Sequence, residues 1–182
     1  TLDPGGRARM HALMREEIQT REQRDRPLFF RRMHLHLFER FDADARPPDA
    51  RSVADAHDRA LVLAASHLVV AAPERLTAFL RSRFDVFRIA ARWHTLEAVL
   101  ELANSTAVIS ATNAIDTAWA LHWLAYVRQA MARYAEAERL FQRALEIRRD
   151  AIGERAPDYA DTLHELADVS HTMGRYAEAE AL

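Results

Sequence analysis

Three side chains near the end of the sequence have the spacing of a metal-binding surface. His164, Asp168 and His171 lie at positions i, i+4 and i+7, so a helix would carry all three on one face. Imidazole and carboxylate groups placed in this way can coordinate zinc. The same residues could instead line an exposed helix face and hold no ion. The choice between these interpretations depends on the elements that position the three residues.

Other kinds of chemistry have less support in the sequence. His34 and His36 are two positions apart, and on a helix such side chains point in different directions, so they make a poor metal pair. All 25 basic residues are arginine and cysteine is absent, which excludes lysine-dependent and thiol-dependent catalysis. Neither a nucleophile elbow nor a glycine-rich phosphate loop is visible around the four glycines. We expect a chain that is not an enzyme and needs no cofactor.

The charge pattern gives no reason to expect binding to nucleic acid or to a membrane. The formal net charge is −2, and acidic residues are interspersed with the basic pairs at 31–32 and 148–149. No apolar run is long enough to span a bilayer. A chain without cysteine is compatible with a reducing compartment, and we expect a cytoplasmic location.

The spacing of apolar residues is helical almost throughout, and no alternating run predicts a strand. Prolines mark helix starts at Pro27 and Pro73 and a break at 47–48. Asp49 or Ser52 could cap the helix that follows this break, and residues 104–113 have the composition of a connector. The sequence thus predicts an all-α fold with helices at about 7–24, 27–42, 50–71, 73–90, 93–104, 114–131, 134–150, 158–173 and from 175 onward.

The sequence repeats itself with a period of 42 residues. The six residues RYAEAE occur at 133–138 and again at 175–180, and 14 of 23 positions are identical between 118–140 and 160–182. A period of this length indicates a solenoid of stacked helix pairs. The first copy has His122, Tyr126 and Gln129 at the places of the three residues described above. Because that set could not hold a metal in the same way, we expect no metal site.

These copies resemble the tetratricopeptide repeats. The pattern of that family is met by Leu121, Leu124–Ala125, Tyr134, Ala137, Phe141 and Ala144, and again by Leu163, Leu166–Ala167, Gly174, Tyr176 and Ala179. The 42-residue period and the connecting residues Arg143–Ile147, Gly153, Pro157, Ala160 and Leu163 are similar to the kinesin-light-chain subtype. The resemblance implies a right-handed α-solenoid of antiparallel helix pairs. We also expect Gly174 to end its helix in a left-handed turn, and Ala132 in the first copy either does the same under some strain or forms a different turn.

A third, degenerate copy is predicted upstream, because Trp93, Leu96, Leu100 and Ala103 fall where Tyr134, Ala137, Phe141 and Ala144 fall. We therefore divide the chain into three parts. Residues 1–72 are a helical region without clear repeats, residues 73–112 are the degenerate helix pair with its connector, and residues 113–182 are repeats, the second of which is truncated at Leu182. The exposed end of the last repeat suggests that further repeats follow in a longer protein.

The family uses its first helices to line a concave groove, and the resemblance places a set of residues of this chain there. The groove is expected to hold Arg81, Asp85 and Arg88 from the degenerate copy, Trp119, His122, Tyr126 and Gln129 from the first clear copy, and Asp161, His164, Asp168 and His171 from the second. Exposed aromatic residues beside hydrogen-bonding groups suit a peptide-binding surface. Histidines in the groove predict that binding changes between pH 5 and 8.

The expected function is therefore non-catalytic binding of a protein or peptide segment, or of another domain of the same polypeptide. Helices followed by 42-residue repeats also resemble the sensor region of bacterial signalling ATPases of the STAND class. Two alternatives remain open at this point. The repeats could position a protease or nuclease domain outside this chain, or they could be a scaffold for oligomers.

Overall fold

The computed structural model describes residues 20–21, 24, 27–47 and 49–182, and most of the helix expected at 7–24 lies outside them. Within the described residues every regular element is helical, so the all-α prediction is confirmed. The elements are α2 (Pro27–Asp44), the 3₁₀ turn η1 (Ala50–Ser52), α3 (Asp55–Ala71), the 3₁₀ turn η2 (Pro73–Arg75), α4 (Leu76–Ile89), α5 (Trp93–Ala103), α6 (Thr106–Ile109), α7 (Ala114–Ala130), α8 (Tyr134–Ile152), α9 (Pro157–Thr172) and α10 (Tyr176–Ala181).

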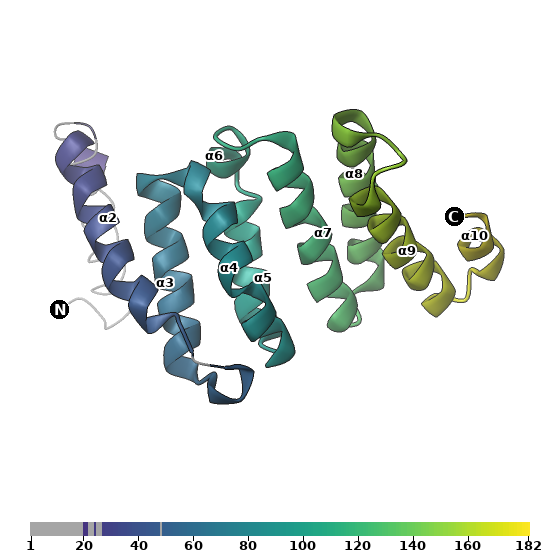
Figure 1. The fold of residues 1–182 in the computed structure, drawn as a ribbon, viewed down its shortest axis with the longest axis horizontal. Helices are drawn as coiled ribbons and strands as arrows, with labels where there is room; N and C mark the ends of the chain where they lie inside the picture. The colour runs from purple at the N-terminus through teal and green to yellow at the C-terminus, as the bar shows by residue number, and fades with distance from the viewer. Residues whose placement is uncertain (1–19, 22–23, 25–26, 48) are drawn as a thin grey trace, which may run out of the picture.

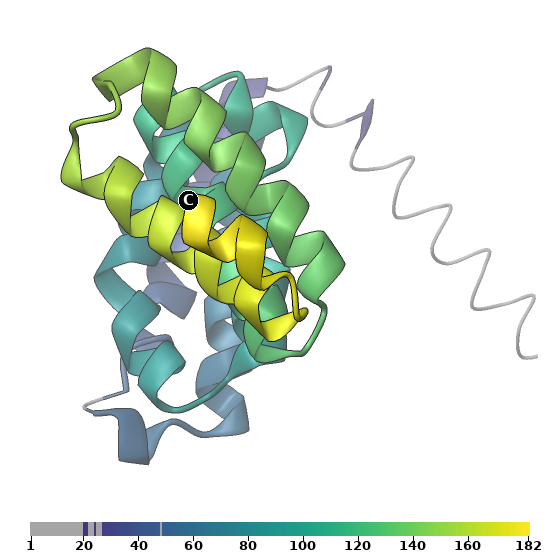
Figure 2. The same ribbon diagram turned by 90° about the vertical axis from the view of Figure 1, so that its right-hand side faces the viewer.

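The helices stack in chain order along the long axis of the molecule, as expected for an α-solenoid (Figure 1). Helices α2, α4, α7 and α9 form a first row, linked by ring contacts between Phe38 and Phe79 at 5.3 Å and between Phe84 and Trp119 at 5.8 Å. Helices α3, α5, α8 and α10 form a second row. Figure 2 looks along the stack from its C-terminal end, with α10 and α9 nearest the viewer and the earlier helices behind them.

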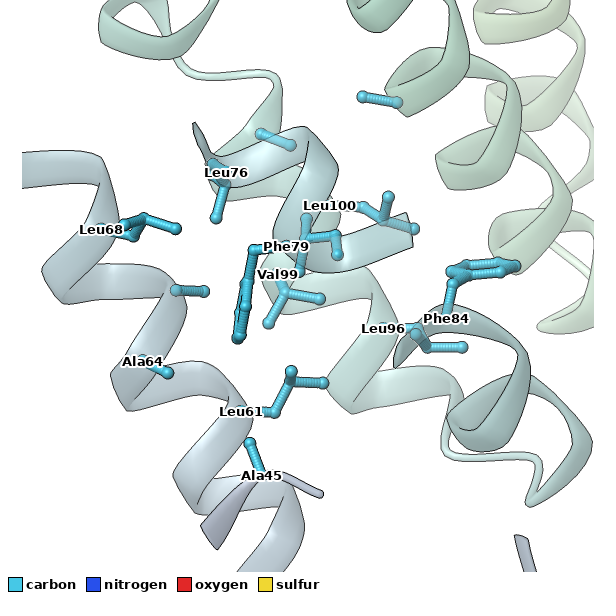
Figure 3. Packing of buried hydrophobic residues seen from close by; sticks show 14 of the residues in the cluster. Ala45, Leu61, Ala64, Leu68, Leu76, Phe79, Phe84, Leu96, Val99 and Leu100 are labelled. Atoms are coloured by element: carbon cyan, nitrogen blue, oxygen red, sulfur yellow. The ribbon is translucent and has the colours of Figure 1, made fainter. Parts of the chain in front are cut away.

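Apolar side chains from both rows meet in one extended core. Around Phe79 of α4 lie Leu61 and Leu68 of α3 and Val99 and Leu100 of α5, which point toward one another from three helices (Figure 3). This cluster reaches from Phe38 to Val127, and a second one joins α7, α8 and α9. The first cluster therefore runs without a break through the boundaries expected at 72 and 112.

Two expected boundaries are wrong. Helix α3 begins at Asp55 instead of 50, after the turn η1, and its N-cap is Ala54 rather than Asp49 or Ser52. The Ala54 backbone N–H donates to Nδ1 of His57 at 3.0 Å. The side chain of the third helical residue thus accepts from the backbone of the N-cap residue, as in one half of a capping box. The expected connector at 104–113 contains the short helix α6, which places Val108 in the core.

The same left-handed turn joins the rows at three places. Gly174 has φ = 78°, as expected, and Ala132 and Ala91 have φ = 60° and 54°. In each turn the next residue, an arginine, donates its backbone N–H to the carbonyl of the residue five positions earlier, which is the hydrogen bond that closes a Schellman motif. Alanine is strained at positive φ, because its Cβ approaches the backbone.

Replacing Ala132 by glycine is expected to raise the free energy of unfolding by about 1 kcal/mol, because glycine removes this strain. In a chain of this size the midpoint of thermal unfolding should rise by about 2–4 °C. The matched control is Ala160→Gly, at an exposed position inside α9, which should lower stability by up to about 1 kcal/mol. A decrease in both variants, measured by calorimetry, would contradict the strain at residue 132.

The arginine that follows each left-handed turn ties that turn to the preceding helix pair. We call these residues, Arg92, Arg133 and Arg175, the turn arginines. They form ion pairs with Asp58 of α3, Glu97 of α5 and Glu138 of α8, respectively. The arginine of the repeated RYAEAE segment is thus a structural contact between neighbouring pairs.

Candidate partner-binding surface

The first row of helices brings some of the predicted groove residues into contact with one another. The Arg81 guanidinium of α4 binds the Asp116 carboxylate of α7 at 3.1 Å and lies over the Trp119 ring at 4.8 Å. Further along, Gln129 of α7 donates to the Asp168 carboxylate of α9 at 2.7 Å. Residues far apart in the sequence are therefore neighbours across α4, α7 and α9, and we call this strip the α4–α7–α9 surface.

Two of the predicted groove residues are buried instead of exposed. The Trp119 side chain is only 9% exposed, because Arg81 covers its face and Phe84 packs against its edge. His122 is 6% exposed and packs against the rings of Trp123 and Phe141. Their place on the helix face was assigned from the repeat, but the neighbouring helices approach so closely that neither side chain is left for a partner.

His122 belongs to a buried polar network that the sequence did not reveal. The Thr162 hydroxyl of α9 donates to the Asp158 carbonyl at 2.9 Å and accepts from the Arg148 guanidinium of α8. Since its single proton is already donated, His122 must be the donor through Nδ1, which lies 3.1 Å from the hydroxyl oxygen. Arg148 also donates to the Asp158 carbonyl. The network fastens α7 and α8 to α9.

Burial controls the charges in this network. It lowers the pKa of His122 to about 3, and the positive charge of Arg148 acts in the same direction. The imidazole is therefore neutral at physiological pH and cannot contribute to the pH-dependent binding expected of groove histidines. Burial also lowers the pKa of Arg148, against the opposing effect of the nearby Asp158 and Asp161 carboxylates.

Nine predicted residues remain accessible on the α4–α7–α9 surface. Arg81, Asp85, Asp161, His164, Asp168 and His171 are exposed, and Arg88, Tyr126 and Gln129 are half-buried. On α4 the charges compensate each other, because Arg88 pairs with Asp85 at 3.0 Å. The α9 part lies beside a hollow of about 400 Å³ lined by His164, Asp168, His171 and Tyr176, among others.

Negative charge is concentrated on α9. Burial raises the pKa of the half-buried Glu165 carboxyl, and Asp168 and Asp161 raise it further, while His164 opposes them. Among the described residues, the hydrogen-bond partner of the Asp168 side chain is the neutral amide of Gln129. This end of the surface therefore favours groups that bring a positive charge or hydrogen-bond donors.

Two of the histidines singled out in the sequence, His171 and His34, contact other rings in the structure. His171 packs edge-on against Tyr176, with ring centroids 5.0 Å apart. His34 is buried and pairs with His67 of α3 at 2.9 Å between the two Nδ1 atoms, whereas His36 is exposed. Within the described part of the chain, no cluster of three or more histidine or acidic side chains has metal-binding geometry.

The network residues Arg148 and Thr162 gave no signal in the sequence, because an arginine and a threonine on helices are usually solvent-exposed. The turn arginines did give a signal in the sequence, since an arginine precedes an aromatic residue at 92, 133 and 175.

None of the described helices is long and apolar enough to cross a membrane.

Comparison with known proteins identifies the C-terminal part of the chain. Residues 116–182, from the first turn of α7 to the last residue, match the tetratricopeptide repeat family. No curated protein matches the sequence. The matched segment contains the buried network, two of the three left-handed turns and the α9 part of the surface.

Proposed function

We infer that this chain, a tetratricopeptide repeat protein by its residues 116–182, is a non-catalytic module that binds a protein or peptide segment on the α4–α7–α9 surface. Tetratricopeptide repeats are in general protein–protein interaction modules. The observation that carries the proposal is the continuity of this surface, on which contacts between Arg81 and Asp116 and between Gln129 and Asp168 align residues of three helices. Binding to another domain of the same polypeptide would use the same residues.

The proposed surface includes α4, which lies outside the matched residues. Its inclusion is supported by the turn at Ala91, where the backbone has the same left-handed conformation and hydrogen bonding as at Ala132 and Gly174. We accordingly treat α4 and α5 as a degenerate repeat that extends the surface toward the N-terminus.

Among the described residues, the pair of Thr162 and His122 has the residue types of a catalytic pair, but its geometry favours a non-catalytic function. An activated nucleophile donates its hydroxyl proton to the imidazole, whereas here the Thr162 proton goes to the Asp158 carbonyl and His122 donates to the hydroxyl oxygen. Here Thr162 is fully buried, and a histidine with a pKa of about 3 is too weak a base to accept the proton near neutral pH.

The three carboxylates on α9 suggest what kind of segment binds. Asp161, Glu165 and Asp168 favour a partner that offers arginine or lysine side chains, and half-buried Tyr126 of α7 adds an aromatic ring to the same surface. We place this module in the cytoplasm, as the sensor part of a larger bacterial signalling protein.

The test is a selection of peptides from a random library displayed on phage, followed by measurement of their affinity for the purified protein by fluorescence anisotropy. A variant with Asp161→Asn, His164→Ala and His171→Ala is expected to bind the selected peptides about tenfold or more weakly. The matched control carries Arg139→Ala, Gln142→Ala and Glu146→Ala on the exposed face of α8 and should bind normally. Equal binding by both variants, or equal loss, would refute the assigned surface, provided that circular dichroism shows both to be folded.

A further inference from the structure

A buried arginine on α4 departs from the pattern of the repeats. Each repeat has a residue nine positions before its turn arginine, and these residues are Arg83, Leu124 and Leu166. All three are buried, and Arg83 is 9% exposed. The structure therefore places a guanidinium group where the two clear copies have a leucine side chain in the core.

Packing alone does not explain this arginine. Taking a charge out of water is costly, and replacing a buried ion pair by apolar residues of similar volume is often neutral or stabilising. Leucine fits the equivalent position in two other helix pairs of the same chain. A purely structural role at this position would be served at least as well by leucine.

The charges around Arg83 do not balance. Its guanidinium lies over the Phe79 ring at 4.7 Å and donates to the Ser82 hydroxyl and to the Asp42 carboxylate of α2. Asp42 is shared, because its second oxygen accepts from Arg46 at 2.9 Å. Two guanidinium groups thus share one carboxylate, and among the ion pairs of the described residues neither Arg83 nor Arg46 has a second acidic partner. Burial and the neighbouring Arg46 lower the pKa of Arg83, while Asp42 opposes them.

Donors remain for a further anion. The Nε–H of Arg83 is buried and has no acceptor among the described residues, so an anion bound beside this guanidinium would offset a charge that the protein leaves partly unsatisfied. Arg46 binds Asp42 through Nη2, and its guanidinium has further N–H groups that this bond does not use. Both arginines and Ser82 line a hollow of about 440 Å³, whose other walls include Pro47 and Val86. A volume of this order is enough for a small organic molecule.

We propose that this hollow between α2 and α4 binds the oxyanion of a small organic acid, with Arg83 and Arg46 holding a carboxylate or phosphate group and Pro47 and Val86 contacting the apolar part. Guanidinium groups bind both kinds of oxyanion through paired, charge-assisted hydrogen bonds. The site is separate from the α4–α7–α9 surface, to which α4 contributes Arg81, Asp85 and Arg88.

The test uses four small probes, added to the purified chain in a buffer of low ionic strength. Benzoate and phenyl phosphate carry the two oxyanions on an apolar ring, acetate carries a carboxylate without the ring, and benzyl alcohol carries the ring without a charge. Binding is followed by isothermal titration calorimetry and by the side-chain Nε resonances of arginine in ¹H–¹⁵N spectra. We expect benzoate or phenyl phosphate to bind more tightly than acetate and to shift the Arg83 resonance. The tighter of the two identifies the preferred oxyanion.

The decisive variant is Arg83→Leu, which restores the residue of the other two copies and is expected to remain folded. It should weaken binding of the better probe by about tenfold or more. Arg46→Gln provides a second variant at a side chain that is 65% exposed, and Arg32→Gln, on an exposed face of α2, controls for general loss of positive charge. The proposal is overturned if neither ring-bearing anion binds, if benzyl alcohol binds as well as they do, or if Arg83→Leu binds them as tightly as the wild type.

Discussion

Replacing Thr162 by valine is expected to lower the free energy of unfolding by about 3 kcal/mol. Valine has nearly the same shape but no hydroxyl, so it leaves the Arg148 guanidinium and the His122 Nδ1–H without their shared acceptor. Buried donors that lose a partner cost about 1–3 kcal/mol each, and more when they are charged. The loss should appear as a lower midpoint in urea unfolding with an unchanged slope.

Two further variants separate this network from the general effect of removing a hydroxyl. Thr172→Val, at an exposed position on the same helix, should change stability by less than about 0.5 kcal/mol. The double variant Thr162→Val with Arg148→Met removes the charge together with its acceptor and should be more stable than Thr162→Val alone. Additive losses in the double variant would show that the two side chains are not coupled.

Acid is expected to destabilise the folded chain well above the range in which carboxylates titrate. An unfolded histidine takes up a proton as the pH falls through about 6.5, whereas folded His122 stays neutral down to about pH 3. The unfolded state binds more protons in this window, so stability falls as the pH falls. Between pH 6.5 and 5 the contribution of His122 alone should be roughly 2 kcal/mol, and by pH 3 it should approach roughly 5 kcal/mol.

The variant His122→Gln isolates this contribution, because glutamine can donate to Thr162 but cannot take up a proton. Urea unfolding at several pH values from 7 to 5 should show a smaller loss of stability for this variant than for the wild type. The same substitution at the exposed His94 controls for the removal of an imidazole. Some pH dependence will remain, since burial also lowers the pKa of His34, aided by His67, and that of His67 itself. Identical slopes in wild type and His122→Gln would exclude His122 as the acid-sensitive group.

The helices and the repeat could be predicted because both depend on local patterns. Apolar spacing located α4 and its buried face from Leu76 to Phe87, and the position of Gly174 indicated a left-handed turn that the backbone adopts. The start of α3 could not be predicted by searching for a polar cap residue, because the N-cap is Ala54. The hydrogen bond at this helix end is accepted by the His57 side chain, which lies inside the helix. Patterns of residue type do not reveal which of several polar side chains reaches the end of a helix.

Repeat spacing indicates some contacts between the helices of the candidate surface but not the accessibility of its side chains. Repeat spacing shows which side of a helix a residue occupies, and Gln129 and Asp168 do meet across two helices. Accessibility depends on how closely the next helix packs and on which side chain it brings. Arg81 covers Trp119 and Thr162 contacts His122, and both contacts involve residues 38 or 40 positions away in the sequence. Such pairings become visible only when the helices are placed in space.

The turn arginines give the solenoid a uniform response to dissolved ions. Each of them links one helix pair to its predecessor through a carboxylate at the corresponding edge, at Asp58, Glu97 and Glu138. These links are at least partly reached by solvent, so mobile ions screen all of them together. Raising the ionic strength should therefore weaken the ion pair at each of these junctions at once, while the apolar core that spans the helix pairs is left in place.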